Sequence, residues 1–218
     1  MNIRASIILL LLFSIATHAV AGPERWEKDI RKFEQQDTEQ SFPKGGILFV
    51  GSSSIRMWKT LEEDFPKHQI LNRGFGGSQV EDSLHFAEQL ILKHAPKQVV
   101  LYAGDNDIAK EKTAERVFAD YIRLIDTIQE SHPKCHVTFI AIKPSLKRWN
   151  LSEEMFRANQ LVNRFSETDE RLSYADIWTP TLTKEGTPMK DIFMEDGLHL
   201  NAKGYAIWRE VIAPLLKD

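Results

Sequence analysis

The sequence is most informative at Ile47-Leu48-Phe49-Val50-Gly51-Ser52-Ser53-Ser54. The apolar half of this stretch has the length and composition of a buried strand, and glycine with small hydroxyl residues ends it. Ile55-Arg56-Met57-Trp58 then returns to a helical pattern. Such a turn presents a hydroxyl at a helix N-terminus, where free N–H groups favour negative charge. The stretch predicts either a nucleophilic serine or an ordinary serine-rich N-cap after a buried strand.

Four further strands are expected at 69–72, 99–103, 136–142 and 173–177, after the first at 46–50. Helical patterns separate them, near Trp26 to Phe33 and at about 79–93, 113–131, 152–167 and from 201 onward. Strands that are continuous apolar runs between helices are typical of a parallel sheet covered on both faces. We therefore predict an α/β fold, a three-layer α/β/α sandwich with right-handed crossovers.

Composition limits the function classes. The chain has 218 residues, 42% hydrophobic and 27% charged, with a formal net charge of -3. No basic footprint of a nucleic-acid binder is visible, and no long Lys/Arg run suggests a membrane-surface protein. Because no repeat or linker divides the chain, residues 22–218 are predicted to form a single domain. The single cysteine, Cys135, is expected to be a buried structural thiol.

The first 21 residues have the pattern of a signal peptide. Arg4 supplies the positive charge, residues 7–15 the apolar core, and Ala19-Val20-Ala21 a small-residue cleavage site before Gly22. The apolar core is too short to span a membrane, and no later segment approaches the roughly 20 apolar residues needed. The expected protein is exported, periplasmic or secreted, with an uncleaved N-terminal anchor as the alternative.

Polar residues follow several of the predicted strands. Ser53 follows the first, Gly74-Phe75-Gly76-Gly77 the second, and Gly104-Asp105-Asn106-Asp107 the third. Asp196-Gly197-Leu198-His199 stands between the last strand and the last helix. In open α/β sheets the ligand crevice lies outside the carboxyl ends of the strands, so we expect these four blocks to meet there.

Together the four blocks supply the parts of acyl-transfer chemistry. Ser53 is the candidate nucleophile, His199 the base that takes its proton, and Asp196 the acid that orients the imidazole. The donors of an oxyanion hole would be the backbone N–H groups of Ser53 and Gly77 and the side-chain amide of Asn106.

Each block also has a simpler interpretation. Gly74–Gly77 could be a tight turn, and it is not a dinucleotide fingerprint because the third glycine would fall at Gln79. Asn106 could be a turn residue or an N-cap. Asp105-Asn106-Asp107 begins like a calcium loop, but Ala109 occupies the next ligand position. Asp196 and His199 could be a surface pair that caps the last helix. No spaced metal cluster is present, so no metal or cofactor is predicted.

The four blocks resemble the SGNH hydrolases, or GDSL esterase/lipase superfamily, and look closest to the branch similar to platelet-activating-factor acetylhydrolase catalytic subunits. The resemblance spans about 45–210 and implies a flavodoxin-like, five-stranded parallel sheet. It also implies catalytic roles for Ser53, Asp196 and His199, with Gly77 and Asn106 in the oxyanion hole. Ser52 stands where the family has aspartate, and three adjacent serines leave the register of the motif open. Ser53 is the predicted nucleophile because it stands two residues after Gly51, as the motif requires, and Ser54 is the alternative.

Residues around these blocks receive weaker assignments. Similar loops in relatives border the active site, so Trp149 is expected to line the substrate pocket or else to pack on its own loop. Arg56 and Trp58 are expected to be buried supports, and Asp107 to brace the Asn106 loop.

The predicted function is a metal-independent serine esterase that hydrolyses short-chain or acetyl esters through an acyl-enzyme. Small-molecule, glycan or lipid esters are the expected substrates. An acyltransferase with the same triad and a non-catalytic carbohydrate- or lipid-binding protein on the same fold are the alternatives.

Overall fold

A computed structural model describes residues 22–40 and 42–218, so the predicted signal peptide lies outside the described residues. Its centre is a parallel sheet in the order β2-β1-β3-β4-β5. The strands are β1 (Ile47–Gly51), β2 (Ile70–Gly74), β3 (Gln98–Tyr102), β4 (His136–Ile140) and β5 (Leu172–Ala175). All five strand predictions are confirmed to within about two residues at each end. The flavodoxin-like order is also confirmed.

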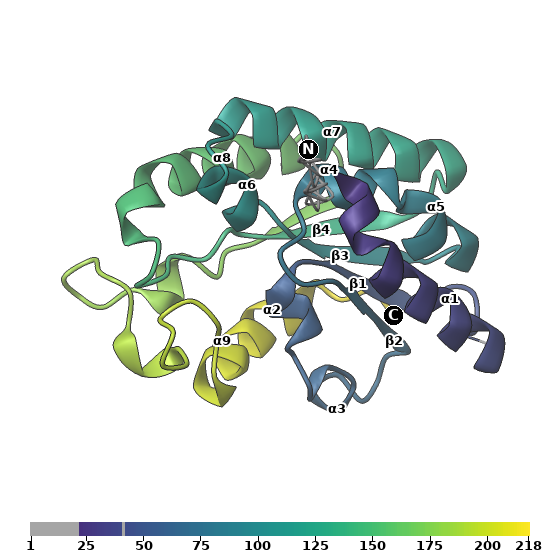
Figure 1. Ribbon diagram of the computed structural model, residues 1–218, viewed down its shortest axis with the longest axis horizontal. Coiled ribbons are helices and arrows are strands. Elements are labelled where there is room, and N and C mark those ends of the chain that lie inside the picture. The colour runs from purple at the N-terminus through teal and green to yellow at the C-terminus, as the bar shows by residue number, and fades with distance from the viewer. Residues whose placement is uncertain (1–21, 41) are drawn as a thin grey trace, which may run out of the picture.

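Helices cover both faces of the sheet. They are α1 (Glu27–Glu39), α2 (Ser53–Arg56), α3 (Leu61–Asp64), α4 (Val80–His85), α5 (Ala87–Leu90), α6 (Asp105–Ala109), α7 (Ala114–Ser131), α8 (Ser152–Ser166) and α9 (Ala202–Ile212). Short 3-10 helices occupy Pro23–Trp26, Leu92–His94, Trp149–Leu151, Thr179–Thr181, Lys190–Ile192 and Ala213–Leu215. In Figure 1, α7 and α8 lie on one side of the sheet and α9 on the other, which confirms the three layers. None of the described helices is long and apolar enough to cross a membrane.

The hydrophobic core follows the apolar runs of the sequence. Every residue of β1 and β3 is buried, as expected for strands covered by helices on both faces. The edge strands β2 and β5 contain partly exposed positions. Cys135 is buried as predicted.

One helix prediction differs from the structure. The segment 79–93 forms α4, α5 and a 3-10 turn instead of one helix, with breaks at Phe86 and Ile91. Both side chains are buried, and the Phe86 ring packs edge-on against Phe75 with centroids 6.5 Å apart. Tertiary packing of these two side chains therefore overrides the local helical pattern.

The strand order reverses between β1 and β3, and this opens a crevice. From β1 the chain moves to β2 on one side, and from β2 it returns to β3 on the other. The turn after β1 is tight because Gly51 has φ +133°, and a Cβ there would lie 1.9 Å from the Tyr102 carbonyl oxygen. Only glycine fits this position, so the chain leaves β1 sharply toward the crevice.

Candidate active site

The three consecutive serines differ in their surroundings. Ser52 and Ser54 are buried, whereas Ser53 is partly exposed at the first position of α2 and lines a cavity of about 450 Å³. The Asn72 side chain fixes α2 by donating to the Ile55 carbonyl oxygen at 2.8 Å. Ser53 is therefore the accessible hydroxyl of the three, while the Ser54 side chain points into the protein.

A short loop before α9 presents His199 to this hydroxyl. Nε2 of His199 lies 3.0 Å from Oγ of Ser53, and Nδ1 lies 2.5 Å from Oδ2 of Asp196. Gly197, with φ +63°, lets the loop turn back so that the two side chains meet. The backbone N–H of Met194 closes the loop by donating to the His199 carbonyl oxygen at 2.8 Å.

Asp196 is held as an acceptor. Its Oδ1 accepts hydrogen bonds from the backbone N–H groups of Leu198 and His199, both at 2.9 Å. Desolvation opposes the charge, but the hydrogen bonds from the His199 side chain and from the backbone lower the pKa of Asp196 to about 2. Asp196 therefore stays ionised at neutral pH and holds a proton on Nδ1 of His199, which leaves Nε2 as the acceptor facing Ser53.

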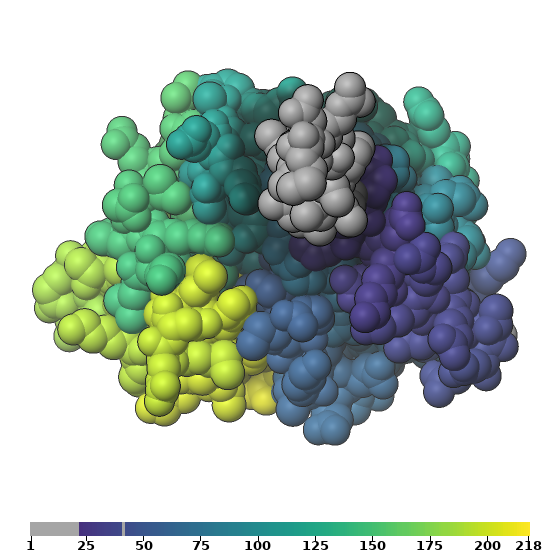
Figure 2. Space-filling view, in the orientation of Figure 1, coloured from purple at the N-terminus to yellow at the C-terminus, as the bar shows by residue number. Residues whose placement is uncertain are grey.

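Contacts of Tyr205 join α9, which follows the His199 loop, to the segment that carries Ser53. The Tyr205 hydroxyl on α9 donates to the Ser54 carbonyl oxygen at 2.8 Å. The Tyr205 ring stacks on Trp58, with centroids 5.0 Å apart. Figure 2 shows the yellow C-terminal segment against the blue segment that contains α2 and α3. The two halves of the site are thus joined directly, although they are far apart in the sequence.

Gly77 and Asn106 line the same cavity as Ser53 and His199. Gly77 has φ +79°, and Asn106 lies in α6 directly after β3. The Asn106 side-chain Nδ2 donates one hydrogen bond to the Ser78 carbonyl oxygen at 3.0 Å. An amide nitrogen carries two hydrogens, so Asn106 keeps a second donor. The structure brings together all five residues that the sequence placed in the triad and oxyanion hole.

Asp107 joins the loops of Gly77 and Asn106. Its carboxylate accepts from the backbone N–H of Val80 at 3.2 and 3.3 Å and from Lys112 Nζ at 3.2 Å. Burial raises the pKa of Asp107 to about 6, although Lys112 and the Val80 hydrogen bond act in the opposite direction. Asp107 therefore makes the contacts expected of a residue that supports the Asn106 loop.

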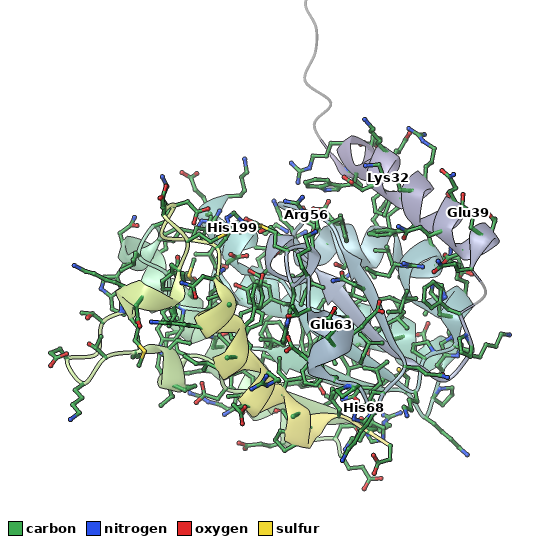
Figure 3. The ribbon with its side chains drawn as sticks, turned by 90° about the horizontal axis from the view of Figure 1, so that it is seen from below. Lys32, Glu39, Arg56, Glu63, His68 and His199 are labelled. Atoms are coloured by element: carbon green, nitrogen blue, oxygen red, sulfur yellow. The ribbon has the colours of Figure 1, made fainter. Side chains whose placement is uncertain are left out.

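Three of the residues that line the cavity come from outside the four predicted sequence blocks: Asp29, Arg56 and Arg148. Arg56 was expected to be a buried support, and this was wrong: its side chain is exposed, while Trp58 is buried as expected. Arg56 is the last residue of the one-turn helix α2, and its side chain lines the cavity instead of packing into the core. Figure 3 shows Arg56 and His199 near one another on the same side of the molecule.

Trp149 does not line this cavity. Its ring stacks on Trp178 with centroids 6.2 Å apart. Trp149 was expected to line the pocket or to pack on its own loop, and its stacking partner belongs instead to the segment after β5. Its contact with substrate stays a prediction. Within residues 22–40 and 42–218, no group of three or more His, Cys, Asp or Glu side chains is placed to hold a metal ion.

Comparison with known proteins agrees with the family resemblance of the four sequence blocks. Residues 49–207 match the model of the GDSL-like Lipase/Acylhydrolase family. The platelet-activating factor acetylhydrolase IB subunit alpha2 of Rattus norvegicus is 26% identical over 197 residues, which cover 88% of this chain and 83% of that protein.

Two solved structures share the fold. A protein from Streptococcus pneumonia named for platelet activating factor superposes with a TM-score of 0.78 at 21% identity, covering 89% of this chain and 96% of that chain. An acetylxylan esterase from Geobacillus stearothermophilus, solved as a catalytic mutant, gives a TM-score of 0.64 at 14% identity, covering 80% and 95%.

Proposed function

Because the chain belongs to the GDSL-like lipase/acylhydrolase family and is a carboxylic ester hydrolase, we propose that it acts through a Ser53–His199–Asp196 triad on short-chain or acetyl esters. The observation that carries this proposal is the continuous contact from Asp196 through His199 to Ser53, at 2.5 and 3.0 Å. Hydrogen bonds of this length connect the acid, base and nucleophile of serine hydrolases.

The proposed mechanism proceeds in two halves. Oγ of Ser53 attacks the ester carbonyl carbon while Nε2 of His199 takes its proton, and Asp196 stabilises the imidazolium. The backbone N–H groups of Ser53 and Gly77 and the Asn106 amide stabilise the oxyanion of the tetrahedral intermediate. His199 then protonates the leaving alcohol, which departs and leaves an acyl-enzyme. His199 then takes a proton from water, which attacks the acyl-enzyme. The bond between the acyl carbon and Oγ breaks, His199 returns the proton to Ser53, and the carboxylic acid leaves.

The cavity supports a small acyl group. Most of the residues that line it are polar, charged or glycine, and the exception is Leu198. A long acyl chain needs an extended apolar surface to leave water, at about 25 cal/mol per Å² of buried area. This lining offers little such surface, so we propose acetyl or other short-chain esters, carried by small molecules, glycans or lipids. One similar structure is that of an acetylxylan esterase.

We also propose that the enzyme is exported and acts in the periplasm or outside the cell. The support is the sequence of residues 1–21, with Arg4, an apolar core and Ala19-Val20-Ala21. Mass spectrometry of the N-terminus of the exported protein should find a start near Gly22. A cytoplasmic, full-length product would contradict this localisation.

Replacement of the nucleophile tests the activity. Ser53→Ala should abolish hydrolysis of p-nitrophenyl acetate and labelling by a fluorophosphonate probe, with circular dichroism unchanged. Ser54→Ala is the matched control, because its buried hydroxyl has no hydrogen-bond partner among the described residues. Ser54→Ala should therefore keep its activity and its labelling. Full activity of Ser53→Ala would refute the assignment.

Substrate class needs a separate measurement. A series of p-nitrophenyl esters from acetate to palmitate should give kcat/KM values that fall as the acyl chain lengthens. Product analysis in the presence of a sugar acceptor then separates hydrolysis from acyl transfer. A maximum at long chains would contradict the proposed acyl preference, and an acylated sugar as the main product would favour a transferase.

A further inference from the structure

Arg148, in the loop after β4, contacts the Asn106 side chain. Its Nη2 donates to Oδ1 of Asn106 at 3.1 Å, and its Nη1 lies 3.1 Å from Oδ2 of Asp105. A guanidinium is planar, so two contacts on different nitrogens fix its orientation. Arg148 therefore joins the loop after β4 to two consecutive residues of α6.

A buried ion pair anchors Arg148. Lys143 and Asp105 are buried, and Lys143 Nζ lies 3.2 Å from Asp105 Oδ2 and 2.9 Å from the Tyr102 hydroxyl. Burial alone would raise the pKa of Asp105, but the charges of Lys143 and Arg148 bring it below its usual value. Asp105 is therefore a fixed negative charge that holds the guanidinium in place.

This arrangement determines which way the Asn106 amide points. The oxygen accepts from Arg148, and the nitrogen donates to the Ser78 carbonyl oxygen. A flipped amide would set its NH2 group against a guanidinium and its oxygen against a carbonyl oxygen, which is unfavourable at both ends. With this orientation fixed, the second N–H of Asn106 is available to the cavity that it lines with Ser53.

We propose that Arg148 is a positioning residue: it locks the Asn106 side chain with an N–H toward the oxyanion, through a buried Lys143–Asp105 anchor. The proposal rests on the proposed function, since it presupposes that Asn106 donates to the oxyanion. Arg148 acts through Asn106 and itself makes no bond to the reacting atoms. It should therefore affect turnover more than substrate binding, whatever the charge of the ester.

The test is a double-mutant cycle with Arg148→Met, Asn106→Ala and the double variant on p-nitrophenyl acetate. Asn106→Ala should lower kcat by about 10²–10³-fold, as expected for loss of an oxyanion donor. Arg148→Met should lower kcat by about 10–100-fold, with KM changed less than about 3-fold. In the Asn106→Ala background, Arg148→Met should lower kcat by less than about 3-fold, because the Asn106 amide through which Arg148 is proposed to act is gone.

Two further variants separate positioning from folding. Lys143 still pairs with Asp105 in Arg148→Met, so the buried carboxylate keeps a cationic partner. Should this variant unfold, Arg148→Lys replaces it, and a single ammonium that cannot span both Asp105 and Asn106 should also lower kcat by about 10-fold or more. Arg164→Met, an exposed arginine on α8, is the matched control and should match the wild type.

The outcomes distinguish the two proposals. Loss of kcat in Asn106→Ala with normal kcat in both Arg148 variants would overturn the positioning role alone. The positioning role would also be overturned if the kcat losses of the two single variants multiply in the double variant. A rise in KM with normal kcat in the Arg148 variants would have the same consequence. An active Asn106→Ala variant would overturn the oxyanion assignment together with this inference, and an active Ser53→Ala variant would overturn the triad itself.

Discussion

Ser52, Ser53 and Ser54 carry the same hydroxyl group, and the backbone around Gly51 gives them different environments. The turn that begins at Gly51 buries the first and third side chains and leaves the middle one in the cavity. The sequence predicted Ser53 from its spacing after Gly51, with Ser54 as the alternative. Spacing favoured Ser53 but did not exclude Ser54, because the side of a short helix that faces solvent depends on what packs against it.

At the same scale, Asp196→Asn should lower kcat about 10²–10⁴-fold without unfolding the protein. The asparagine Oδ1 can still accept from the backbone N–H groups of Leu198 and His199. Its NH2 group, however, would face Nδ1 of His199 and move the imidazole proton to Nε2, which can then no longer take the Ser53 proton. The rate of p-nitrophenyl acetate hydrolysis checks this, and activity within about 3-fold of wild type would contradict it.

Arg148 shows which part of the site the sequence could not predict. Asn106 stands out in the sequence because it follows a strand in the block Gly104-Asp105-Asn106-Asp107. Arg148 lies 42 residues later in a loop and has no spacing relation to that block. Only the parallel neighbours β3 and β4 bring the two loops together. Residues inside one motif block, such as Asn106 and the neighbouring Asp107, could be predicted from the sequence, whereas a supporting residue from another loop needs the three-dimensional structure.

Among the elements, periodicity predicted those with long apolar patterns. The five strands and the long helices α1, α7, α8 and α9 were found because their apolar runs are several residues long. The short helices α2 and α6, which carry Ser53 and Asn106, each occupy about one turn. For α2 the sequence predicted only a helical pattern at 55–58, two residues late, and α6 was not predicted at all. The elements nearest the chemistry were therefore the hardest to predict.

The contact between α9 and α2 yields a prediction at this scale. Tyr205→Phe removes the hydroxyl that donates to the Ser54 carbonyl oxygen, so the free energy of unfolding should fall by about 1–2 kcal/mol. Because this contact joins α9 to the segment of Ser53, its loss should shift His199 slightly relative to Ser53, so we expect kcat to fall several-fold. Urea unfolding and ester hydrolysis measure the two effects.

Tyr121→Phe is the matched control for this substitution. The Tyr121 hydroxyl is buried and has no hydrogen-bond partner among the described residues, so its removal should leave stability equal or higher. Equal losses of stability in the two variants would show that the Tyr205 hydrogen bond has no special role in joining α9 to α2.

The raised pKa of Asp107 predicts how the stability of the whole molecule depends on pH. Burial raises the pKa of its carboxyl from 3.8 to about 6 in the folded protein, while the unfolded chain keeps the ordinary value. The folded state therefore binds this proton more tightly, and the resulting stabilisation is complete below about pH 4 and lost as the pH rises through about 6. Relative to Asp107→Asn, the wild type should lose on the order of 3 kcal/mol over that range.

Urea unfolding of both proteins at several pH values between 4 and 7 measures this difference. The Asp107→Asn variant keeps a side-chain oxygen that can accept from the Val80 N–H. A pH-dependent difference in stability between the two proteins therefore reports the titration of Asp107 and not the loss of this hydrogen bond. A stability difference that stays constant across this range would contradict the raised pKa of Asp107.

The contact of His199 with Ser53 joins residues 146 positions apart in the chain. A ribosome therefore makes the Ser53 hydroxyl, the glycine loop and Asn106 long before His199, whose imidazole activates the serine in the proposed mechanism. Until α9 has been synthesised and has docked, the growing polypeptide holds a serine of ordinary reactivity. Truncated products that end before β5 lack His199 and should not hydrolyse esters. A nascent chain should become active only in the last stage of folding.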